Sequence, residues 1–269
     1  MSRIAETFSH LKSVSRRGLI PFITAGDPDL ATTRALIVEL ARAGASVIEL
    51  GVPFSDPVAD GPVIQRASER ALRLHVGVRD VLAVVADARR ETDVPIVLFS
   101  YLNPLLQFGM ERLATETKQA GIDGVLVTDL VPEEAGEFAA TLAAHQLDQI
   151  FLAAPTTSDA RLSMIARRAR GFIYAISRAG VTGARSELSG EAEKLVGRLR
   201  RVTDLPIAVG FGISNSEQVA EVWRYADAAV VGSALVAEIE RRDGAVDLVS
   251  GVGAFARALL PPVSLPPNG

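Results

Sequence analysis

The chain of 269 residues contains no cysteine and only three histidines. Without cysteine there is no disulfide framework, no thiolate nucleophile, no iron–sulfur cluster and no thiolate zinc site. His10, His75 and His145 are scattered, with no spacing that would bring two of them to one metal ion. We interpret them as residues on helix surfaces. Catalytic chemistry must therefore rest on other side chains.

Charge of one sign is not in excess, because 28 Lys and Arg residues stand against 32 Asp and Glu residues. This balance offers no basic surface to a nucleic acid or an anionic membrane. The N-terminal segment MSRIAETFSHLKSVSRR lacks the apolar region of a signal peptide. The longest uncharged run, residues 94–110, is interrupted by prolines and a glycine and is shorter than the roughly 20 apolar residues of a membrane span. We expect a cytoplasmic protein with no nucleic-acid or membrane partner.

The sequence does contain a regular alternation of short apolar runs and amphipathic segments. Eight apolar runs are expected to form strands, at residues 19–24, 46–50, 96–99, 124–127, 150–153, 172–176, 207–210 and 228–231. Segments with apolar residues at helical spacing lie between them, among them residues 30–43, 113–120, 133–145, 160–170, 190–202 and 216–225. Strands that alternate with helices indicate right-handed βαβ units and a parallel sheet.

Eight such units, about 30 residues apart, favour an α/β fold of the (β/α)8 TIM-barrel type. An open doubly wound sheet is the alternative, because GFGISN at residues 210–215 looks like part of a dinucleotide fingerprint. That motif lacks the third glycine and follows the seventh strand rather than the first. We predict a single barrel domain over residues 1–260, with a helix before the first strand and a short extra helix after the eighth. Residues 261–269 are predicted to be a flexible Pro-rich tail.

Glu49 closes the second predicted strand, at the end where active sites of such barrels lie. Strand alternation points this carboxyl inward among apolar neighbours. Desolvation there would raise its pKa and suit it to donating and accepting protons near neutral pH. A neighbouring arginine or backbone amide could instead make it a structural residue at the barrel rim, and both interpretations stay open.

A long loop with two aspartates follows this strand, and loops of such length on a compact barrel are usually functional. Asp56, in Ser-Asp-Pro, is typical of turn initiation. Asp60 precedes Gly61-Pro62, where a helix is expected to start. It could therefore cap that helix or reach back over the mouth of the barrel.

Three glycine-bearing loops follow the sixth, seventh and eighth strands: GVTG at 180–183, GFGIS at 210–214 and GSA at 232–234. Glycine lets backbone amides approach an anion closely, and a helix that begins at Ser233 would point its positive end at the same place. Each loop alone could be only a tight turn, but the three together indicate a phosphate site. Aromatic residues at strand ends could line a pocket for a flat ligand or belong to the core: Phe22, Tyr101, Tyr174 and Phe211. The single tryptophan, Trp223, is predicted to pack from a helix.

These motifs together resemble the tryptophan synthase alpha subunit family, of the ribulose-phosphate-binding barrel group. The resemblance runs from the first strand to the eighth. It is carried by PFITAGDP (21–28), ELGVPFSDPVADGP (49–62), SYLNP (100–104), TDLVPEE (128–134), APTT (154–157), SRAGVTGAR (177–185), GFGIS and VGSA. The second of these motifs is highly specific.

The resemblance implies a carbon–carbon lyase that cleaves indole-3-glycerol phosphate to indole and glyceraldehyde 3-phosphate, with no metal or organic cofactor. It implies that Glu49 protonates C3 of the indole ring and then takes the proton of the glycerol 3′-hydroxyl, while Asp60 accepts or stabilises the indole N–H proton. It also implies substrate-binding residues. The phosphate would lie at Gly183, Gly212, Gly232 and Ser233, and the indole near Phe22, Phe99, Tyr101, Tyr174, Thr182 and Phe211. The loops that carry Asp60 and Thr182 would close over the substrate.

The resemblance further implies a β subunit that binds pyridoxal phosphate and receives indole through a tunnel, in an αββα heterotetramer. The docking surface would include residues 53–57, 101–110 and 129–134. A stand-alone lyase that releases free indole would carry the same motifs and is the alternative. A sister barrel enzyme of the same pathway and a non-catalytic phosphate-binding regulatory barrel fit less well, because Glu49 and Asp60 are both present.

Overall fold

The computed structural model describes residues 2–176, 185–210 and 212–262, and its parallel strands close into an eight-stranded barrel. Each strand pairs with its neighbours in the sequence, and the first pairs with the last. The strands are β1 (Gly18–Thr24), β2 (Ile48–Gly51), β3 (Ile96–Ser100), β4 (Gly124–Val127), β5 (Asp148–Ala153), β6 (Ile173–Ile176), β7 (Ile207–Gly210) and β8 (Ala228–Val231). The predicted TIM barrel is confirmed and the doubly wound alternative is wrong. Most of the predicted tail, residues 263–269, lies outside the described residues.

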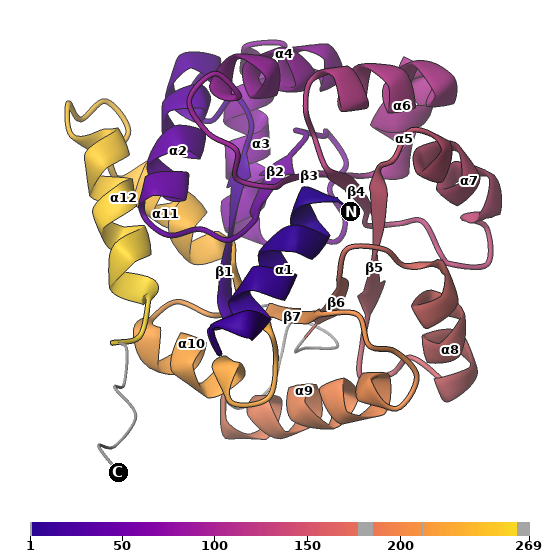
Figure 1. Cartoon of the computed structure of the whole chain (residues 1–269). Coiled ribbons are helices and arrows are strands. Elements are labelled where there is room, and N and C mark those ends of the chain that lie inside the picture. Colours follow the sequence, from indigo (N-terminus) through magenta and orange to yellow (C-terminus); the bar gives the residue numbers. More distant parts are fainter. Residues whose placement is uncertain (1, 177–184, 211, 263–269) are drawn as a thin grey trace.

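Helices surround this barrel (Figure 1). They are α2 (Leu30–Arg42), α3 (Pro62–Arg73), α4 (Val78–Ala88), α5 (Leu102–Phe108), α6 (Met110–Gln119), α7 (Gly136–Ala144), α8 (Asp159–Arg168), α9 (Arg185–Arg200), α10 (Ser216–Trp223), α11 (Ser233–Arg241) and α12 (Leu248–Leu259). The short α11 is the predicted extra helix after the eighth strand, and it begins at the predicted residue, Ser233. Of the helices in the described residues, none is both long and apolar enough to cross a membrane.

The strands separate two apolar layers. One fills the inside of the barrel with residues such as Ile20, Val97, Leu126, Ile150 and Val230. The other lies between the strands and the helices and contains Ile23, Leu50, Leu98, Val125 and Val209. Because both faces of each strand are buried, the strands appear in the sequence as almost continuous apolar runs. This is the pattern from which they were predicted.

Helix α1 (Arg3–Ser13) covers the end of the barrel at which the strands begin (Figure 1). Its apolar face enters the barrel interior through Ile4 and Phe8, which are both buried. The ring of Phe8 lies 5.8 Å from that of Phe172, at the base of β6. The predicted helix before the first strand is confirmed, and it closes the end of the barrel opposite to the expected active site.

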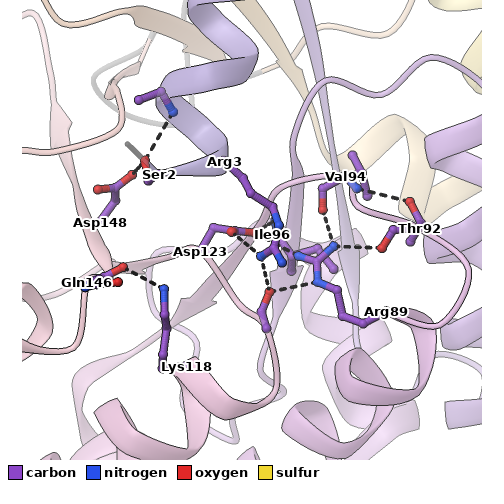
Figure 2. Close-up of polar contacts among 12 residues, drawn as sticks. Ser2, Arg3, Arg89, Thr92, Val94, Ile96, Lys118, Asp123, Gln146 and Asp148 are labelled. Carbon is purple, nitrogen blue, oxygen red and sulfur yellow. Dashed lines mark hydrogen bonds and ion pairs between the residues drawn. The ribbon is translucent and has the colours of Figure 1, made fainter.

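The buried carboxylate of Asp123 joins α1 to this end of the barrel (Figure 2). Asp123 accepts hydrogen bonds from the guanidinium of Arg3 at 2.8 Å, from that of Arg89 at 2.9 Å and from the backbone N–H of Ile96 at 2.9 Å. The Arg89 side chain is only 11% exposed, and burial lowers the pKa of its guanidinium. Asp123 therefore compensates a desolvated positive charge as well as joining α1 to the barrel.

Replacement of Asp123 by alanine is expected to lower the free energy of unfolding by about 3–5 kcal/mol, because it leaves the Arg89 charge buried without its partner. Urea denaturation would measure this loss. The matched control is Arg3→Ala, which removes the 43% exposed partner of the same carboxylate and is expected to cost under about 1 kcal/mol. Equal losses in the two variants would contradict the role given to Arg89.

The residues that are rare in the sequence play structural parts. His10 is exposed on α1 and His145 ends α7, as predicted. The prediction is wrong for His75, which lies in the turn after α3 because its positive φ of 57° ends the helix. Trp223 packs from α10, as predicted, and its indole N–H donates to the Gly18 carbonyl at 2.9 Å. The described residues contain no group of three or more His, Asp or Glu side chains that could hold a metal ion.

Candidate active site

Glu49 lies in β2 with its side chain inside the barrel, and it is only 1% exposed. Neighbouring strands place Phe22 and Val97 beside it. Its Oε1 atom has no hydrogen-bond partner among the described residues. Burial raises the pKa of this carboxyl to about 8, and no charged neighbour among the described residues offsets that effect. The arrangement agrees with a carboxyl that is protonated near neutral pH rather than with a structural ion pair.

Glu49 faces a cavity of about 110 Å³ at the end of the barrel where the strands finish. The described residues that line it are Phe22, Glu49, Ala59, Asp60, Gly61, Ile64, Phe99, Tyr174, Gly212, Val230, Gly232 and Ser233. Most of the site residues expected from the sequence are thus brought together. Sequence reasoning missed Ala59, Gly61, Ile64 and Val230, which carry no reactive group. Thr182, Gly183 and Phe211 lie outside the described residues.

Aromatic side chains form the apolar part of the cavity wall. The rings of Phe22 and Phe99 meet edge to face, with centroids 5.2 Å apart. Tyr174 of β6 is buried beside the neighbouring strand β7. A Cβ atom on Gly210 of β7 would lie 2.2 Å from the tyrosine hydroxyl oxygen. Glycine at position 210 is therefore what admits the tyrosine ring. Burial, and next the charge of Glu49, raise the pKa of the Tyr174 hydroxyl.

Asp60 lies on the loop that forms another wall of the cavity. The N-cap of α3 is Gly61 rather than Asp60, so the capping interpretation is wrong and the carboxyl is free to face the cavity. Burial raises its pKa to about 6, although a hydrogen bond with Tyr101 lowers it. Asp60 is thus ionised for the most part near neutral pH.

Tyr101 does not line the cavity but holds the loop that does. Its hydroxyl oxygen accepts a hydrogen bond from the backbone N–H of Ala59 at 2.9 Å. Its ring lies 5.2 Å from that of Phe54, on the same loop. Asp56 is exposed there and accepts a hydrogen bond from the hydroxyl of Ser55, which agrees with its interpretation as a turn residue.

The third wall offers backbone amides. Gly232 is the N-cap of α11 and makes no side-chain cap hydrogen bond, and both Gly232 and Ser233 line the cavity, so the N-terminus of the helix lies at this wall. Gly212 adopts a φ of +79°, which glycine tolerates best. A helix N-terminus of this kind suits a phosphate group. The third loop that was predicted to contribute, at 180–183, lies outside the described residues.

The cavity therefore combines two carboxyls whose pKa values are raised by burial, Glu49 to about 8 and Asp60 to about 6, with an apolar wall and the N-terminus of a helix. A sequence model of the family described as tryptophan synthase alpha chain matches residues 8–258. The chain belongs to the tryptophan synthase alpha chain family.

Relatives in the family match this chain over nearly its whole length. The tryptophan synthase alpha chain of Geobacter sulfurreducens is 51% identical over 259 residues, which are 96% of this chain and 98% of the relative. That of Chloroflexus aurantiacus is 48% identical over 267 residues, 99% of this chain and 100% of the relative. A crystal structure of tryptophan synthase subunit alpha from Legionella pneumophila superposes with a TM-score of 0.89 at 39% identity, and the match covers 96% of this chain and 97% of that one.

Membership of the tryptophan synthase alpha chain family confirms the resemblance found in the sequence and the activity that it implied. The protein is a carbon–carbon lyase of tryptophan biosynthesis, which cleaves indole-3-glycerol phosphate to indole and glyceraldehyde 3-phosphate. The regulatory and sister-enzyme alternatives are thereby excluded. The family alone does not say which side chains perform the cleavage.

Proposed function

We propose that Glu49 and Asp60 are the acid–base pair of the cleavage. Glu49 donates its proton to C3 of the indole ring. The carbon–carbon bond to the glycerol chain then breaks, its electrons return to the ring, and the Glu49 carboxylate takes the proton of the 3′-hydroxyl, whose carbon becomes the aldehyde. The carboxylate of Asp60 stabilises the positive charge that develops at the indole N–H. The observation that carries this proposal is the buried Glu49 carboxyl, whose Oε1 atom has no hydrogen-bond partner among the described residues, in a cavity that it shares with Asp60.

The cavity also suggests how the substrate lies. We propose that the phosphate lies at the amides of Gly212, Gly232 and Ser233 and the indole against the aromatic wall; the resemblance adds Gly183, which lies outside the described residues, to the phosphate site. The residues of that wall would be Phe22, Phe99 and Tyr174, with Tyr101 supporting the loop that carries Asp60; the resemblance adds Thr182 and Phe211, which lie outside the described residues. A volume of about 110 Å³ is below the roughly 300–1,000 Å³ of ordinary ligand pockets. We therefore propose that the loop that carries Asp60 opens to admit substrate and closes over it; the resemblance implies the same for the loop that carries Thr182.

A β subunit is the partner that we propose for this chain, in an αββα heterotetramer. Three large apolar side chains are exposed on or beside the three loops expected to dock: Val58 (87%), Leu106 (51%) and Val131 (38%). A partner that covered these side chains would remove their apolar surface from water, which favours association. The chain itself would need no cofactor, and pyridoxal phosphate would be bound by the β subunit, which receives the indole. The assembly would work in the cytoplasm.

The test is to measure indole release from indole-3-glycerol phosphate with and without an added tryptophan synthase β subunit. Strong activation by the β subunit is expected, and Leu106→Glu should abolish that activation while it leaves the activity of the isolated chain intact. Val246→Glu is the matched control, because Val246 is fully exposed in the turn between α11 and α12. High activity that the β subunit does not change would favour the stand-alone lyase that releases free indole.

A further inference from the structure

Four alternating charges join α3 to β1 and to α11. Both carboxylate oxygens of Asp27 accept hydrogen bonds from Arg70, at 2.7 and 2.9 Å. The remaining amino group of Arg70 donates to Glu240 at 2.7 Å, and Arg66 donates to both oxygens of Glu240 at 2.8 and 2.7 Å. We call these four residues the α3 quartet. Its charges balance, and its central guanidinium reaches two carboxylates from different elements.

Asp27 gives the quartet a fixed end. It lies three residues after the end of β1 and is 1% exposed, and its backbone N–H donates to the Thr24 carbonyl. The preceding amide, of Gly26, donates to the buried hydroxyl of Thr33 at 2.9 Å. Burial raises the pKa of the Asp27 carboxyl, whereas the hydrogen bonds and charge of Arg70 lower it. Two parallel hydrogen bonds from one guanidinium to a buried carboxylate fix the relative position of the two side chains.

The apolar packing of α3 is weak by comparison. Its buried residues are only Ala67, Ser68 and Ala71, whereas α2 buries Leu36, Ile37, Val38 and Leu40. Small side chains bury little apolar area, and the hydrophobic free energy scales with that area. Val63 and Ile64 add partly buried apolar contacts, so the quartet supplements a modest apolar contact with hydrogen bonds of fixed geometry.

Helix α3 in turn carries Asp60. Gln65, in the second turn of the helix, donates from its side-chain amide to the Asp60 carbonyl at 2.9 Å, and its backbone N–H donates to the Gly61 carbonyl. Ile64 of the same helix lines the cavity beside them. At the other end of the quartet, Glu240 belongs to α11, whose first residue, Ser233, also lines the cavity. The quartet thus links the wall that carries Asp60 to the wall that offers backbone amides.

We propose that Arg70 is a positioning residue for the cleavage, which acts through α3 to hold Asp60 at the substrate. Arg70 lies outside the cavity and does not touch substrate. The inference rests on the role proposed for Asp60. Misplacement of a catalytic group by about 1 Å can cost about 10² in rate, so Arg70 influences the reaction without taking part in it.

The test is a double-mutant cycle on the full chain, with Arg70→Met and Asp60→Asn, at a temperature where circular dichroism shows every variant folded. Arg70→Met alone is expected to lower kcat for indole release about 10²-fold and to change KM less than threefold. When Asp60→Asn is already present, adding Arg70→Met should change kcat less than twofold, because the Asp60 carboxylate through which Arg70 acts is already lost. Compared with Arg70→Met, Arg70→Lys should recover more of the thermal midpoint than of kcat. Lysine keeps the positive charge, but one ammonium cannot span two carboxylates.

Arg73→Met is the matched control, because Arg73 is an exposed arginine on the same helix, and it should leave kcat unchanged. Three outcomes would overturn the proposal: equal kcat values for Arg70→Met and Arg73→Met, additive losses in the cycle, or a rise in KM at constant kcat. If Asp60→Asn itself leaves kcat unchanged, the role of Asp60 fails instead, and the two failures are thereby distinguished.

Discussion

Glu49→Gln is expected to lower the rate of indole formation by about 10³–10⁴-fold, the upper part of the range for one acid–base group. The glutamine amide has nearly the shape of the carboxyl but can neither deliver a proton to indole C3 nor take one from the hydroxyl. Steady-state indole release measures the effect, and binding of glycerol 3-phosphate, which reports on the amides near Ser233, should be unchanged. Turnover near that of the wild type would contradict the mechanism.

The same substitution should stabilise the protein at high pH. Below about pH 4.5 the carboxyl is protonated in both the folded and the unfolded chain. Between pH 4.5 and about 8 the unfolded chain loses the proton and the folded chain keeps it, so the free energy of unfolding falls as pH rises, by at most about 1.4 kcal/mol per pH unit. Glutamine has no proton to lose. The stability of Glu49→Gln relative to wild type should therefore rise from pH 4.5 to 8 in urea denaturation.

The control for this stability effect is Glu69→Gln, at an exposed glutamate on α3. It should show no gain over the same pH range, because folding does not bury this side chain. A constant stability difference between Glu49→Gln and wild type across the range would show that the carboxyl is not kept neutral by burial.

Asp60→Asn is expected to lower kcat/KM by about 10²-fold, because a neutral amide stabilises the developing charge at the indole N–H less well than a carboxylate does. The wild-type profile of kcat/KM against pH should be bell-shaped. Activity is lost below about pH 6 as Asp60 takes up a proton, and above about pH 8 as Glu49 loses the proton that it must donate. In Asp60→Asn the lower limb should disappear and the upper limb remain.

Asp56→Asn is the matched control for Asp60→Asn in the isolated chain, since Asp56 lies on the same loop but is exposed and does not line the cavity. It should keep both limbs of the pH profile. If the lower limb persists unchanged in Asp60→Asn, the acid–base role belongs to another group.

Much of this architecture follows from the local pattern of the sequence. The predicted strands 124–127, 207–210 and 228–231 have the observed bounds, because strands buried on both faces are apolar throughout. Strand β5 begins at Asp148, two residues before the predicted strand at 150–153. The prediction missed Asp148 and Gln149 because these buried residues are polar and interrupt the apolar signal. The inward direction of Glu49 followed from alternation along its strand.

Features that depend on distant contacts could not be predicted in this way. Arg70 is 43 residues from Asp27 and 170 residues from Glu240 along the chain, and each of the three looks like an ordinary surface charge in the sequence. Two further features depend on how the chain turns between packed elements. One is the positive φ of His75, and the other is that the N-cap of α3 is Gly61 rather than Asp60. Aspartate and glycine are both found at helix N-caps, so local preference could not decide between Asp60 and Gly61.

Helix α1, which closes the end of the barrel where the strands begin, has a consequence for the synthesis of the chain. Helix α1 leaves the ribosome before any strand of the barrel. Its contacts are nevertheless with residues made much later: Asp123, then Asp148, which accepts a hydrogen bond from Ser2, and then Phe172. Domains generally fold during synthesis as their residues become available. About two thirds of the chain must therefore emerge before α1 can dock, and until then its apolar face stays open to chaperones.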